Sequence, residues 1–97
     1  MRTSILQTAT ATTTSSLVVA SSPTRHGLLF LAPFNTGRVT VNTRPPTADG
    51  DGLVLQADSG AVQLTRAEHG DIVSLAWFAR AAASSVLVSW IETAEVG

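Results

Sequence analysis

The two histidines, His26 and His69, are the residues best suited to act as a general base, and each lies beside a turn signal. A serine nucleophile needs such a base beside it, and the base needs a third group that orients it. None of the serines lies in a Gly-x-Ser-x-Gly nucleophile elbow. The sequence therefore predicts no catalytic residue and no enzyme activity. We interpret both histidines as surface or strand-edge residues.

Asp49 and Asp51, in the run Ala-Asp-Gly-Asp-Gly, resemble the start of a calcium loop. A calcium site needs several oxygen ligands, including a bidentate acid at a fixed spacing further along the chain. That spacing is absent, so we interpret the segment as a plain turn, with a weak calcium site as the alternative. Zinc is not expected, because Cys is absent and two histidines are too few nitrogen ligands. The sequence thus predicts no metal and no cofactor.

Trp77, Phe78 and Trp90 admit two interpretations: the core of a small sandwich, which we favour, or a platform on which a sugar stacks. Nucleic-acid binding needs clustered basic residues with interleaved aromatic ones. The arginines are dispersed and Tyr is absent, so no nucleic-acid partner is expected. No apolar run approaches the roughly 20 residues of a membrane span, so no membrane partner is expected either.

Charged residues make up only 13% of the 97 residues, against about 25% in an average soluble domain. All six basic residues are Arg, and the net charge is −1. Few charges and many hydroxyl groups suit a surface that neighbouring proteins cover. A domain this small without disulfides often gains stability by oligomerisation or by docking on a larger assembly.

Short apolar or alternating runs, separated by turn residues, predict an all-β fold. We expect an antiparallel β-sandwich or barrel of six to eight short strands. The expected strands are 17–20, 28–31, 38–42, 53–55, 61–65, 72–78 and 86–91. The strand at 28–31 is apolar on both faces, which indicates a central position in its sheet.

One segment, residues 66–83, also fits a helix, because its apolar residues recur at helical spacing. Gly70 and the content of large apolar residues argue for a strand instead. We expect a strand through Phe78, followed by a loop or short helical turn over 79–84.

The threonine-rich segment 1–16 predicts an extended N-terminal arm, flexible or laid on a neighbour, that precedes a sandwich domain at 17–97. The alternatives are a first β-strand and disorder. If the segment is an arm, deleting residues 1–14 leaves the fold intact and weakens assembly.

The chain from Arg25 to Glu92 has a recurring order of short strands. An Arg-x-Gly-Leu strand at 25–31 is followed by Val39-Thr40-Val41, a Gly-Leu strand at 52–55 and a closing strand ending in Trp90. This order resembles small virion proteins of tailed bacteriophages, β-sandwich proteins found as head-decoration (cement) proteins and in head or tail fibres. The alanine-rich stretch 79–84 departs from that pattern.

The resemblance implies a structural virion protein, most simply a decoration protein on the capsid surface, assembled in the host cytoplasm. Its expected partners are the major capsid protein or other virion proteins and further copies of itself, with a homotrimer favoured. Arg25, Arg38 and Arg44 could pair with acids of the shell. The alternatives are a head or tail fibre component and a carbohydrate-binding module that uses Trp77 or Trp90.

Overall fold

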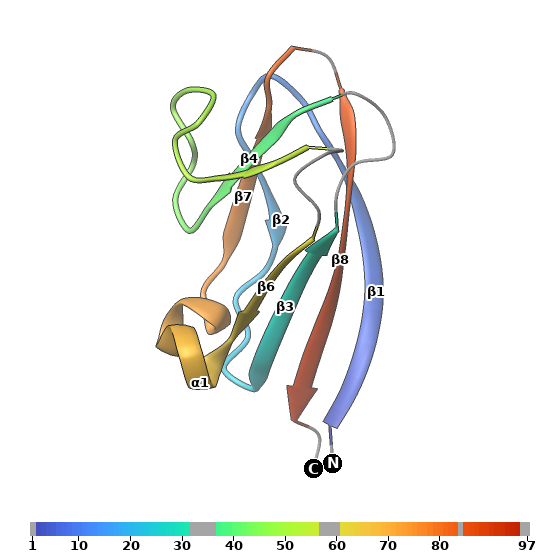
Figure 1. The fold of residues 1–97 in the computed structure, drawn as a ribbon, viewed down its shortest axis with the longest axis vertical. Helices are drawn as coiled ribbons and strands as arrows, with labels where there is room; N and C mark the ends of the chain where they lie inside the picture. The colour runs from blue at the N-terminus through green and yellow to red at the C-terminus, as the bar shows by residue number, and fades with distance from the viewer. Residues whose placement is uncertain (1, 32–36, 57–60, 84, 96–97) are drawn as a thin grey trace.

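The computed structural model describes residues 2–31, 37–56, 61–83 and 85–95. Within these ranges the chain forms eight strands in two four-stranded sheets packed face to face, and every strand pair is antiparallel (Figure 1). The expected all-β sandwich is confirmed.

Each sheet combines strands from distant parts of the chain. Sheet A has the order β1 (Arg2–Ala11), β8 (Val86–Glu95), β3 (Arg25–Leu31) and β6 (Val62–Thr65). Sheet B has the order β2 (Ser16–Val19), β7 (Trp77–Ala81), β4 (Val39–Asn42) and β5 (Leu53–Leu55). The apolar run at 28–31 lies within β3, between β8 and β6, in the central position that its composition predicts.

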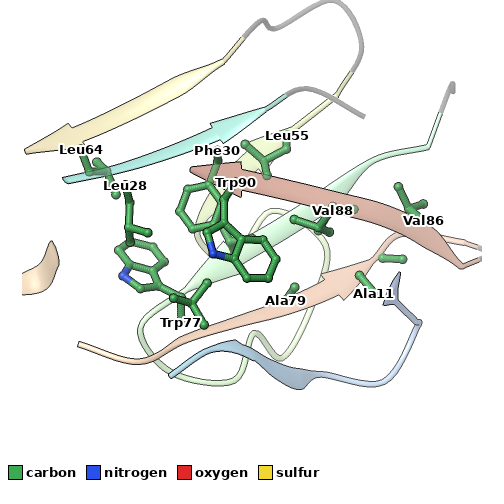
Figure 2. Packing of buried hydrophobic residues seen from close by; sticks show 14 of the residues in the cluster. Ala11, Leu28, Phe30, Leu55, Leu64, Trp77, Ala79, Val86, Val88 and Trp90 are labelled. Carbon is green, nitrogen blue, oxygen red and sulfur yellow. The ribbon is translucent and has the colours of Figure 1, made fainter. Parts of the chain in front are cut away.

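The core fills the space between the two sheets, because alternate residues of each strand point inward. Figure 2 shows Phe30 and Trp90 of sheet A reaching toward Trp77 of sheet B. The rings of Phe30 and Trp77 meet edge to face, with centroids 5.5 Å apart and planes inclined by 62°. Such aromatic pairs add roughly 1 kcal/mol to the stabilisation that their burial provides.

The N-terminal segment is extended, as expected, and its residues 2–11 form strand β1 of sheet A. Ten consecutive residue pairs, from Arg2 with Glu95 to Ala11 with Val86, join β1 to β8 without a register shift. Ala11 is fully buried in the core, and Ala9 packs against it. The structure therefore has the strand that the sequence left as an alternative to a free arm.

The expected strand over 72–78 is wrong in its first half. A one-turn helix, α1 (Arg66–His69), and a 3-10 helix, η1 (Gly70–Ser74), precede β7, which begins at Trp77. β7 then continues to Ala81, through residues expected to form a loop or helical turn. No helix of the described ranges is long and apolar enough to span a bilayer.

Candidate interaction surface

Sheet A has an inner face that packs against the core and an outer face on the opposite side. Val88, Trp90 and Phe30 point into the core and are at most 2% exposed. Because successive side chains alternate, the residues between them lie on the outer face of the sheet.

A row of apolar residues crosses the middle of this outer face. Leu6 on β1 pairs with Ile91 on β8, Ile91 pairs with Leu29 on β3, and Leu29 pairs with Gln63 on β6. Leu6 is 63% exposed although it is a large apolar residue. Directly opposed residues of neighbouring strands lie about 5 Å apart, so the apolar row is continuous over β1, β8 and β3 and ends at the polar Gln63 on β6.

Hydroxyl groups surround the apolar row. Ser4 and Thr93 face each other, and their side-chain oxygens are 3.1 Å apart in a hydrogen bond. On the other side of the row Thr8 pairs with Ser89, and beyond it Thr10 pairs with Leu87, which is 49% exposed. This outer face thus alternates hydroxyl and apolar groups.

No Asp, Glu, Lys, Arg or His occurs in the described stretches that build the middle of this face, which are 3–11 of β1, 86–91 of β8, 27–31 of β3 and 62–65 of β6. Charged residues lie at the end beyond them, where His26 is 3.7 Å from Glu95 and where Arg66 and Glu68 line a shallow hollow with Gln63 and Thr93. Four strands about 4.8 Å apart and roughly seven residues long give an area on the order of 400 Å². Exposed patches of this size often carry function. We call the outward-facing residues of these uncharged stretches the sheet A face.

Much of the outer face of sheet B is covered by the chain itself. The loop between β4 and β5 folds onto it, on the side of the molecule away from β1 (Figure 1). Thr40 of β4 is fully buried there, and its hydroxyl accepts a hydrogen bond of 2.9 Å from the Gly50 backbone N–H. Arg80 of β7 donates to the carbonyl of Thr47 at 2.9 Å. The covering is partial, since Leu17 at the β2 edge of sheet B is 55% exposed, whereas the outer face of sheet A exposes large apolar residues both in its middle, at Leu6, and near its end, at Leu87.

Two ion pairs fix this covering loop. Arg38 bonds to Asp49, and Arg44 contacts Asp51 with a nitrogen–oxygen distance of 2.6 Å. These guanidinium groups lower the pKa of both aspartates, and the Thr47 backbone N–H lowers the pKa of Asp51 further.

The same contacts decide between the two interpretations of the acidic pair. Both carboxylates are engaged by arginine, and the described residues contain no cluster of three or more metal-ligating side chains. The geometry of Asp49 and Asp51 therefore favours the turn over the calcium site.

Arg25 lies inside the molecule and not at a surface. It is 2% exposed, and its Nη2 is 2.7 Å from a carboxylate oxygen of Glu92. Its guanidinium also donates to the backbone carbonyls of Val73, at 2.9 Å, and Leu75, at 3.0 Å, and to that of Ala20. The expectation that this arginine could pair with a shell is wrong, because its own chain covers and neutralises it.

Arg38 and Arg44 remain partly exposed, yet each already has a carboxylate partner in the same chain. A pairing with an external acid would have to compete with these contacts. The structure brings none of the three arginines onto the sheet A face.

The histidines lie at the end of the sandwich near α1. His26 is 3.7 Å from a carboxylate oxygen of Glu95, and Nδ1 of His69 accepts a hydrogen bond of 3.1 Å from the backbone N–H of Thr65. His26 is in strand β3 and His69 ends the exposed helix α1. These positions agree with the surface and strand-edge interpretation.

Trp77 and Trp90 are 3% and 2% exposed. Because both rings are enclosed in the core, neither offers a face on which a sugar could stack. The core interpretation of these tryptophans is confirmed, and the alternative of a carbohydrate module that uses them is wrong.

Comparison with known proteins gives a likeness of fold. No family model matches the chain, and no curated protein matches it. A similar solved structure is a chain from Bacillus endospore appendages, which are described as a family of disulfide-linked pili. The two share 11% sequence identity, with a TM-score of 0.57 over 96% of this chain and 83% of the other. At this identity the likeness extends to the fold alone.

Proposed function

We propose that the protein is a non-catalytic structural component of a tailed-bacteriophage virion, a decoration protein that binds the head shell through the sheet A face. The observation that carries this proposal is the contrast between the two sheets. The chain covers much of the outer face of sheet B with its own loop, whereas the sheet A face is uncharged and exposes Leu6 and Leu87.

The size of the sheet A face implies weak binding for one copy. A stable protein–protein interface buries about 800 Å² on each partner, roughly twice the area of this face. Many copies on a repeating shell can still bind firmly, because each contact of an oligomer raises the effective concentration of the next. An oligomer, for which the virion resemblance favours a trimer, would present several such faces at once.

Because the face is uncharged, the proposal predicts how binding should respond to salt. Ionic contacts between proteins weaken as salt is added, because mobile ions screen them. Binding through Leu, Ile, Ser and Thr side chains should change little between low and high salt. Binding through Arg38 or Arg44 would weaken strongly over the same range.

The pilus likeness supports a related role. The similar chain comes from appendages described as disulfide-linked pili, so this kind of sandwich occurs in a filamentous assembly, and a head or tail fibre is the second candidate. The chain lacks cysteine, so any contact between its copies is non-covalent.

The test combines stoichiometry with binding. The copy number of the protein in purified native particles should stand in a fixed ratio to the major capsid protein. Recombinant protein should also co-sediment with heads that lack it, equally at low and high salt. A few copies per particle would reject decoration and favour a fibre.

A matched pair of variants tests the surface. Leu87→Glu places a charge on the sheet A face and should weaken binding at least about tenfold, a loss of about 1.4 kcal/mol. Leu17→Glu alters an equally exposed leucine on β2 of the other sheet and should bind as the wild type does. Equal binding by both variants would reject the sheet A face as the site.

A further inference from the structure

The free edge of β1 is the longest strand edge that the described residues expose. β1 borders sheet A, and its ten residues pair with β8 on one side only. An edge strand presents a row of unpaired backbone N–H and C=O groups, which can pair with a strand of another chain. Natural proteins usually block such edges with charges, prolines or bulges. Residues 3–11 of β1 contain none of these.

The other three edges of the sandwich are protected. β5 has three residues and β6 has four, and β6 runs directly into helix α1. β2 has four residues, and its register with β7 shifts between Leu17 and Val19. Short or irregular edges of this kind pair poorly with another strand. Among the described strands, β1 therefore stands apart as the edge suited to strand addition.

Two consecutive side chains of β1 are left uncovered on opposite faces. Leu6 lies on the sheet A face, and Ile5, one position earlier, faces the inner side. Their exposed fractions are 63% and 54%. Ile5 lines an open groove of about 250 Å³ together with Ala20 and Ser22, which follow the end of β2. A strand added beside β1 would cover apolar surface on both faces at once.

We propose that β1 of a second copy of this chain adds to this edge in antiparallel orientation, joining two copies of sheet A into one eight-stranded sheet. The occupant is a second copy because the edge is self-complementary. Nothing in residues 3–11 repels its own duplicate, and a two-fold axis makes antiparallel pairing the natural outcome.

The face alternation also restricts the register. Opposed residues must lie on the same face of the joined sheet, so even-numbered residues of one β1 pair with even-numbered residues of the other. Near-complete overlap then allows Leu6 opposite Leu6 of the second copy or Gln7 opposite Gln7. We propose the first, because it covers the most exposed apolar residue of β1 with its own duplicate, and it sets Ser4 opposite Thr8. Ile5 falls opposite Gln7 on the inner side. This register gives roughly eight backbone hydrogen bonds, because alternate residue pairs exchange two bonds each.

The pairing stands independently of the proposed function, although it would set two sheet A faces side by side. It joins two copies and no more, so the trimer favoured by the virion resemblance would need a different contact. The shared edge is narrower than a typical obligate interface, and we expect a reversible dimer whose fraction rises with protein concentration.

The first test measures mass in solution. Sedimentation of the full chain should show a species of twice the 10.1 kDa chain mass that grows with concentration. Ile5→Lys charges the edge without altering the sheet A face and should remain monomeric. Leu87→Lys charges the face away from the edge and should dimerise as the wild type does. A wild-type chain that is monomeric or trimeric throughout, or loss of the dimer in Leu87→Lys alone, would overturn the pairing.

The second test uses the absence of native cysteine. Under mild oxidation Leu6→Cys should yield a disulfide-linked dimer, because residue 6 meets its own duplicate at the two-fold axis. Thr8→Cys lies on the same strand and face, but its duplicate is roughly 13 Å away along the paired strands, so it should stay uncrosslinked. Equal crosslinking of the two variants would reject the register. No crosslink in Leu6→Cys, in a sample whose mass is that of a dimer, would reject this register, and a dimer that persists in Ile5→Lys would reject the edge.

Discussion

At the scale of the single residue, Arg25 is the charged side chain that is buried among the described residues. Its guanidinium ties the end of β2, the segment after η1 and β8 together through one carboxylate and three carbonyls. Sequence alone gave no sign of this, because its partner Glu92 lies at the other end of the chain and an arginine before a strand usually faces solvent. The structural role follows from tertiary contacts only.

Removing the Arg25 side chain should therefore be costly. Arg25→Met leaves Glu92 without its partner in a mostly buried position, which typically costs about 3 kcal/mol or more. Urea unfolding should show this as a lower midpoint. The double variant Arg25→Met with Glu92→Leu should recover part of the loss, because no unpaired charge remains. A loss below about 1 kcal/mol in the single variant would contradict the buried role.

Asp51 should make part of the stability dependent on pH. Arg44 holds the pKa of this carboxyl below the value near 3.9 that it has in the unfolded chain. Its ion pair therefore stabilises the fold above about pH 4, and the contribution is lost as the pH falls toward the lower folded-state pKa. Asp51→Asn should unfold more easily than the wild type near pH 7, with a difference that shrinks below pH 4. Asp71→Asn, on exposed η1, is the charge-matched control. A constant difference across this range would contradict the assignment.

At the scale of the element, the strands with clear alternation were predictable, whereas a helix within 66–83 was considered only as the less favoured alternative. Val39 and Val41 face inward as their pattern predicts, and the strand at Leu53–Leu55 has the expected bounds. The segment after Thr65 was misinterpreted because large apolar residues outweighed the local signal. That signal was present, since Thr65 followed three residues later by Glu68 is a capping-box pattern.

The cap at Thr65 should be measurable. Its hydroxyl oxygen accepts a hydrogen bond of 3.2 Å from the Glu68 backbone N–H, while His69, in place of Glu68, accepts from the Thr65 backbone. Thr65→Ala removes the capping oxygen and should cost about 1 kcal/mol. Thr65→Ser keeps that oxygen and should cost clearly less. Thermal unfolding of the two variants separates the cap from the general effect of altering β6, and equal losses would argue against the cap.

At the scale of the whole molecule, the low charge content indicated a surface that other proteins cover, but composition could not show where on the fold that surface lies. The ion pairs of Arg38 and Arg44 lie in the loop over sheet B, Arg25 and Glu92 pair inside the molecule, and the charges of α1 lie at one end of the sheet A face. Which face is left uncharged depends on the order of the strands in each sheet. In sheet A this order places β1 beside β8, so strands from the two ends of the chain are neighbours. No local pattern reports such a pairing, so neither the sheet A face nor the β1 edge could be derived from the sequence.

The threonine-rich sequence predicts a fold that survives deletion of the N-terminal segment. Because β1 is a strand of sheet A, we expect instead that the deletion destabilises the fold. Deleting residues 2–11 removes Ala11 and Ala9 from the core and strips β8 of one neighbour along its whole length. In a domain of this size each 1 kcal/mol shifts Tm by about 4–8 °C. We expect the truncated chain to be mostly unfolded at 25 °C and therefore to show little cooperative unfolding on heating.

A peptide of residues 1–12 supplied in trans should restore that transition by pairing again with β8, whereas a peptide of the same composition in scrambled order should not. Circular dichroism melting with and without peptide checks this. A truncated chain that melts like the full-length protein would show that β1 adds no stability to the sandwich. The segment would then be the dispensable arm that its threonine-rich sequence predicts.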